Sequence, residues 1–132
     1  MSSEPDSKMP VETWNGSCHC GNVRFTLNIR TSLYEQDITS CNCSICQRNG
    51  YLIIYPKSSD ITWHSGQDSL KNYYFGSKRI GHRFCPECGT SIFGISDTPG
   101  FFEDVAALNV RTLEGIEIEK LKLKQLIGCS TL

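Results

Sequence analysis

Seven of the eight cysteines in this 132-residue chain fall into three tight groups, which restricts its fold more than any other feature. The groups are Cys18-His19-Cys20, Cys41-Asn42-Cys43-Ser44-Ile45-Cys46 and Cys85-Pro86-Glu87-Cys88, and Cys129 stands alone. The polar first ten residues carry no apolar segment of the kind that directs secretion, so we expect a cytoplasmic protein, with the nucleus as the alternative. Thiols stay reduced in these compartments, and closely spaced cysteines there are typical of metal sites rather than of disulfides.

The first and third groups together supply a complete ligand set for one zinc ion. Zinc binds four ligands tetrahedrally, commonly two from each of two knuckles. Cys18 and Cys20 are two residues apart, so in an extended segment both sulfurs point to one side and His19 points away. In the third group, Gly89 lets the backbone turn so that its amides face the sulfurs. We therefore expect a structural zinc on Cys18, Cys20, Cys85 and Cys88, joining an early hairpin to a late one.

The middle group offers three thiolates within six residues. Catalytic zinc sites keep three protein ligands and one exchangeable position, and a zinc with three thiolates is soft enough to accept another thiolate. Cys41, Cys43 and Cys46 thus predict a second, catalytic zinc, which makes two zinc ions per chain. The alternative is that a histidine or Cys129 supplies a fourth ligand and this zinc is purely structural.

Two other residue types near these groups are candidates for chemistry. His64 and His82 are candidates for a fourth ligand or a proton carrier, although a single histidine is more often a surface or hydrogen-bonded group. Arg48 follows the middle group by two residues and could hold a substrate carboxylate, but a solvated surface arginine fits equally well. We assign no catalytic residue beyond the second zinc site and no organic cofactor.

Composition and charge narrow the class of protein. The hydrophobic fraction of 39% and the charged fraction of 20% are those of a globular domain. A net charge of −1 gives no basis for binding nucleic acid or an anionic membrane surface. No stretch approaches the roughly 20 apolar residues of a membrane helix. We expect residues 1–12 to form a flexible leader and residues 13–132 a single zinc-binding domain.

Short apolar runs separated by glycine and proline predict a mainly β fold of small antiparallel sheets, with the knuckles in its turns. A short helical turn, capped by Ser44 and ending at Asn49-Gly50, should follow the middle group. Residues 116–126 fit either a short helix followed by a strand or one strand. The expected strands lie within Trp14–Leu27, Tyr51–Tyr55, Ile61–His64, Leu70–Phe75, Lys78–Phe84, Thr90–Ile95 and Glu103–Leu108, with turns at Gly66, Gly76 and Pro99-Gly100.

The three groups in this order resemble the glutathione-dependent formaldehyde-activating enzyme family, which includes centromere protein V. The resemblance runs from about Trp14 to Leu126 and rests on Cys18-His19-Cys20-Gly21-Asn22-Val23, Cys41-Asn42-Cys43-Ser44-Ile45-Cys46 and Phe84-Cys85-Pro86-Glu87-Cys88-Gly89-Thr90. It implies a β-tent fold and the same division into a structural and a catalytic zinc. It further implies a zinc-dependent carbon–sulfur lyase of small thiol adducts, such as glutathione plus formaldehyde giving S-hydroxymethylglutathione. The alternative is a non-catalytic, zinc-stabilised interaction module.

Overall fold

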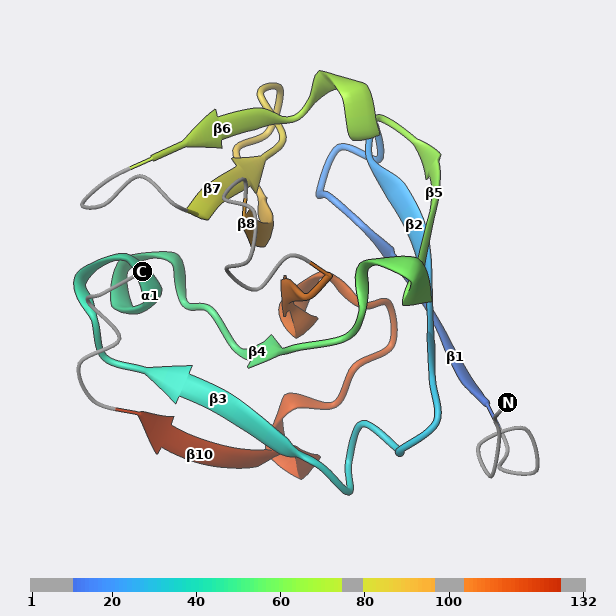
Figure 1. Ribbon diagram of the computed structural model, residues 1–132, viewed down its shortest axis with the longest axis vertical. Coiled ribbons are helices and arrows are strands. Elements are labelled where there is room, and N and C mark those ends of the chain that lie inside the picture. Colours follow the sequence, from blue (N-terminus) through green and yellow to red (C-terminus); the bar gives the residue numbers. More distant parts are fainter. Residues whose placement is uncertain (1–10, 75–79, 97–103, 127–132) are drawn as a thin grey trace.

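The computed structural model describes residues 11–74, 80–96 and 104–126, and within them the chain is mainly β (Figure 1). No helix in these ranges is long and apolar enough to span a membrane. The strands are β1 (Glu12–Ser17), β2 (Arg24–Ile29), β3 (Asp37–Cys41), β4 (Ile53–Ile54), β5 (Ile61–Ser65), β6 (Lys71–Tyr73), β7 (Ile80–Phe84), β8 (Ser91–Ser96), β9 (Ala106–Asn109) and β10 (Lys122–Leu126). One α-helix, α1 (Ser44–Asn49), and the 3-10 turns η2 (Ser58–Asp60), η3 (Gln67–Ser69), η4 (Val110–Thr112) and η5 (Ile118–Lys120) complete the described elements.

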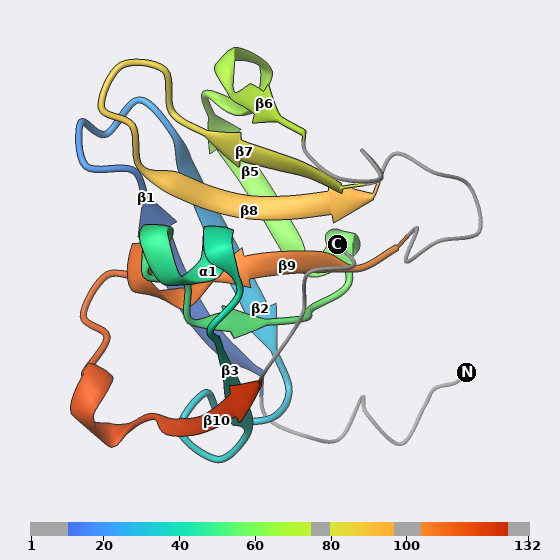
Figure 2. The same cartoon turned by 90° about the vertical axis from the view of Figure 1, so that its left-hand side faces the viewer.

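The strands form two sheets. The smaller has the order β1-β2-β5, and the larger has the order β10-β3-β4-β9-β8-β7-β6. Figures 1 and 2 show the smaller sheet running along one side of the molecule, with β7, β8 and β9 side by side in the larger. The strand pairs are antiparallel, as predicted, except that β10 pairs with β3 in parallel and places Leu126 opposite Cys41.

The main core lies between the two sheets. Phe25, Leu27 and Ile29 alternate along β2 with exposed or half-exposed residues, which is the period expected of a strand with one buried face. The Phe25 ring packs on Trp63 of β5 with centroids 5.2 Å apart, and Trp63 packs on Phe93 of β8 at 5.1 Å. These aromatic contacts join the smaller sheet to the larger one.

The local predictions around α1 and β10 are confirmed with small differences. Helix α1 ends at Gly50, whose φ of 64° is the left-handed conformation that glycine adopts most easily. The residue at its N-cap is Cys43, not Ser44, and no side chain caps the helix. Residues 116–126 form the two-part alternative, with η5 followed by β10. The expected turns at Gly76 and Pro99-Gly100, and most of the leader, lie outside the described residues.

Candidate metal centres and the adjoining cavity

The first cluster brings together four cysteines from two distant turns. Cys18 and Cys20 follow β1, and Cys85 and Cys88 follow β7. The Sγ atom of Cys20 lies 3.6 Å from that of Cys18 and 3.7 Å from that of Cys85, and all four Sγ atoms lie within 4.8 Å of one another. Four sulfurs at this separation form a donor set that could hold a metal ion.

Backbone hydrogen bonds shape both turns around these sulfurs. In the early turn the Val23 amide donates to the Cys18 Sγ at 3.3 Å, and the Gly21 amide donates to the Cys18 carbonyl at 3.2 Å. In the late turn the Gly89 amide donates to the Cys85 carbonyl at 2.8 Å. Both glycines have φ near +80°, so the close turns depend on residues without a Cβ.

The thiols of the first cluster differ strongly in acidity. A hydrogen bond with the Thr90 side chain, together with backbone hydrogen bonds from Cys20 and Thr90, lowers the pKa of Cys88 to about 5. The Asn22 amide lowers the pKa of Cys20, but desolvation and the three neighbouring thiols outweigh it and raise that pKa to about 12. Crowded thiols cannot all ionise without a compensating cation, which is the condition that a bound metal ion relieves.

The second cluster consists of Cys41 at the end of β3, Cys43 before α1 and Cys46 within α1. Their Sγ atoms also lie within 4.8 Å of one another, and all three side chains are buried. The Cys43 amide donates to the Cys41 Sγ at 3.3 Å. Burial and the neighbouring Cys43 raise the pKa of Cys46 to about 12. The strand end and the first turn of the helix thus gather three soft donors that could hold a metal ion.

The oxidation state of this second cluster differs from the sequence-based expectation of reduced thiols. Cys43 and Cys46 are free thiols, as are the four cysteines of the first cluster, but Cys41 is disulfide-bonded. A cysteine binds metal as a thiolate, so reduction of Cys41 must precede metal binding by all three residues. Cys129, the fourth ligand considered from the sequence, lies outside the described residues.

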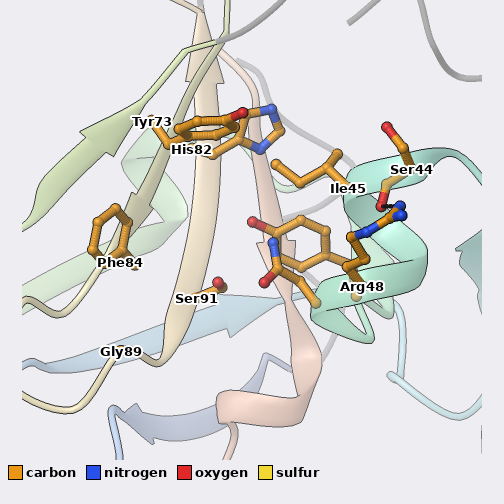
Figure 3. A pocket seen from close by; sticks show the side chains of 10 residues that line it. Ser44, Ile45, Arg48, Tyr73, His82, Phe84, Gly89 and Ser91 are labelled. Carbon is orange, nitrogen blue, oxygen red and sulfur yellow. Dashed lines mark hydrogen bonds between the residues drawn. The ribbon is translucent and has the colours of Figure 1, made fainter.

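A cavity of about 680 Å³ opens between α1 and the strands β6, β7 and β8. Figure 3 shows Ser44, Ile45 and Arg48 of α1 on one side, and Tyr73, His82 and Phe84 on the other. Ser44 and Ile45 lie between two cysteines of the second cluster in sequence, and Gly89 directly follows the last cysteine of the first. The cavity therefore lies beside both clusters and has the size of a small-ligand site.

The floor of the cavity carries a stacked pair of rings from Tyr51 and His82. Their centroids are 6.2 Å apart and their planes differ by 21°. Burial raises the pKa of Tyr51, against hydrogen bonds with the side chains of Ser91 and Asn49, and burial lowers the pKa of His82. Near neutral pH the phenol keeps its proton and the imidazole is uncharged.

The remaining sequence candidates are placed clearly. His64 is exposed and hydrogen-bonds through Nε2 to the Thr26 hydroxyl at 2.7 Å, in the smaller sheet, away from both clusters. His82 and Arg48 both line the cavity. Sequence reasoning assigned Tyr51 only to packing and left Ser91 out, because no spacing links residues that three separate elements bring together.

Comparison with known proteins agrees with this geometry. The sequence model of the family described as glutathione-dependent formaldehyde-activating enzyme matches residues 13–123. The fold is similar to a crystal structure of a Rhodobacter sphaeroides protein from structural genomics, with a TM-score of 0.68 and 27% sequence identity. The similarity covers 83% of this chain and 99% of that one.

Proposed function

Because the chain belongs to the glutathione-dependent formaldehyde-activating enzyme family, we propose that it is a zinc-dependent carbon–sulfur lyase of small thiol adducts. The proposed reaction joins glutathione and formaldehyde to S-hydroxymethylglutathione, and runs in reverse as a lyase. The thiol sulfur bonds to the carbonyl carbon, and the thiol proton ends on the former carbonyl oxygen. The observation that carries this proposal is the cavity lined by Ser44 and Ile45, between cysteines of the second cluster.

We assign two zinc ions to the seven clustered cysteines. Cys18, Cys20, Cys85 and Cys88 would hold a structural ion, and Cys41, Cys43 and Cys46 would hold the second. The donor chemistry supports this assignment, since groups of three and four thiols suit a soft or borderline metal. Zinc at the second cluster would supply Lewis acidity and lower the pKa of an incoming thiol.

The residues of the cavity would manage the proton and the oxygen. The Tyr51 hydroxyl, kept protonated by burial, can donate a hydrogen bond to the oxygen on which negative charge develops. His82, kept neutral by burial, can accept a proton at one ring nitrogen and release it from the other. The apolar walls supplied by Ile45 and Phe84 limit the water that competes with the thiol.

One observation favours the alternative function, a non-catalytic zinc-stabilised module. Cys41, Cys43 and Cys46 are only 6%, 8% and 4% exposed, so little of their surface is open to an added thiol. A fourth protein ligand at this cluster would close the metal site and leave the chain with two structural ions.

The deciding experiment compares rate and coordination in the same zinc-loaded protein. Exchange NMR would measure the rate of S-hydroxymethylglutathione formation above the uncatalysed rate, and X-ray absorption would count zinc–sulfur bonds with and without glutathione. We expect acceleration that Cys43→Ser abolishes, and an added sulfur ligand in the wild-type protein alone. A wild-type rate equal to the uncatalysed one, with a zinc that never admits an added sulfur, would leave the structural module.

A further inference from the structure

Arg48 is the one formally charged side chain among the ten residues that line the cavity. The other nine are apolar, aromatic, hydroxyl or amide residues, glycine and the neutral His82. A single cation in a site with no acidic lining residue attracts an anionic ligand.

The helix holds the Arg48 guanidinium at the mouth of this cavity. Its Nη1 atom donates to the Ser44 carbonyl one turn earlier, at 3.1 Å, so the side chain lies back along α1 (Figure 3). Among the residues that the structure describes, no carboxylate forms a salt bridge with Arg48. The fork of remaining N–H donors is therefore available to a bidentate acceptor.

We propose that Arg48 selects the substrate, by binding a carboxylate of a thiol whose sulfur is directed to the second cluster. This inference rests on the proposed function for the identity of the reacting group, but the carboxylate contact is a property of the cavity itself. Arg48 follows Cys46 by two residues on the same short helix, so the anion and the thiol would be read by neighbouring parts of one element. The substrate class is a small carboxylate-bearing thiol rather than a neutral alkyl thiol.

The test separates carboxylate binding from thiol chemistry by using S-methylglutathione, which keeps both carboxylates and has no ionisable thiol. Its Kd would be measured by calorimetry for zinc-loaded wild-type protein, Arg48→Gln, Arg48→Lys and Arg111→Gln. Arg111 is the matched control, because its Nε atom also donates to a backbone carbonyl beside α1, that of Gly50, but it is not among the cavity residues. Inorganic phosphate as a competitor would report whether any anion satisfies the site.

We expect Arg48→Gln to weaken binding about tenfold or more, the usual loss for a charge-assisted hydrogen-bonded pair, with a smaller loss in Arg48→Lys and none in Arg111→Gln. Equal affinity in wild-type protein and Arg48→Gln, absence of wild-type binding, or full displacement by phosphate at matching concentration would overturn the proposal. Arg48-dependent binding without any rate acceleration would refute the lyase function and leave the carboxylate site standing. Acceleration of the reaction without Arg48-dependent binding would do the opposite.

Discussion

Replacing Cys20 should destabilise the zinc-loaded protein more than replacing Cys43, although Cys20 is exposed and Cys43 is buried. Ordinary packing predicts the reverse order, because a serine at a buried position loses more contacts than one at the surface. The reason lies in the length of chain that each metal site closes. The paired sulfurs of Cys20 and Cys85 belong to residues 65 positions apart, whereas Cys43 and Cys46 are separated by a single turn.

The two ring sizes give a magnitude. In the chain-entropy description, a cross-link closing about 65 residues stabilises the fold by about 4 kcal/mol, and one closing a single turn by about 2 kcal/mol. The difference of about 2 kcal/mol corresponds to roughly 8 °C in Tm for a domain of this size. Both variants would be zinc-loaded under reducing conditions, with Tm followed by circular dichroism and zinc content by mass spectrometry.

Chelation of the wild-type protein provides the control, because it removes the same long ring as Cys20→Ser and should bring Tm down to a similar value. A Cys20→Ser chain that is unfolded as isolated agrees with the argument. Equal Tm values for the two variants, or a lower one for Cys43→Ser, would show that packing at the cysteine outweighs the ring and would refute the reasoning.

Three further predictions concern a turn, a buried imidazole and the oxidised cysteine. Gly66→Ala should cost several kcal/mol in the free energy of unfolding measured with urea, since its Cβ would lie 2.3 Å from the Asn22 carbonyl oxygen at φ +80°; Gly115→Ala, with the same φ and no atom within 4 Å, isolates the backbone cost of about 1 kcal/mol, and equal losses would contradict the steric argument. His82→Phe should flatten the fall of stability below pH 6.5, because the lowered pKa of His82 makes the unfolded chain bind a proton first, at up to about 1.4 kcal/mol per pH unit; that stability is complete above pH 6.5 and lost as the pH falls, and parallel wild-type and variant curves between pH 7 and 5 would exclude this role. Protein isolated without reductant should take up one zinc per chain and a second only after phosphine reduction frees Cys41; two equivalents without reductant, by mass spectrometry, would be inconsistent with the disulfide state.

Local chemistry made much of the structure predictable. The cysteine spacing alone groups the same seven residues that meet in space, because ligands two or three residues apart have few other geometries. The helix end at Gly50 and the two-part segment before Leu126 also follow from local signals. These features depend on conformational preferences within a few residues of chain.

Long-range pairing and the cavity were not predictable in the same way. The alternation of β3 and β10 is compatible with several partners, so nothing local specifies that they pair in parallel. The run from Tyr51 to Tyr55 is apolar on both faces, and only Ile53 and Ile54 form strand β4, because Tyr51 instead turns toward His82 in the cavity. The oxidation of Cys41 depends on the redox environment as well as on position, so spacing cannot reveal it.

The order of the cysteines along the chain also sets the order in which they emerge during synthesis. Cys41, Cys43 and Cys46 are complete as a group some 42 residues before Cys88 is added, an interval of roughly 2–8 s at translation rates of about 5–20 residues per second. During this time Cys18 and Cys20 have no late knuckle, and the nearest thiols are those of the middle group. A zinc ion captured then would find up to five thiols and no correct set of four. The nascent chain is thus exposed to a mixed site that must be dismantled before β7 and β8 can close on the first hairpin, and the cellular supply of free zinc, rather than hydrophobic collapse, would set how often this error occurs.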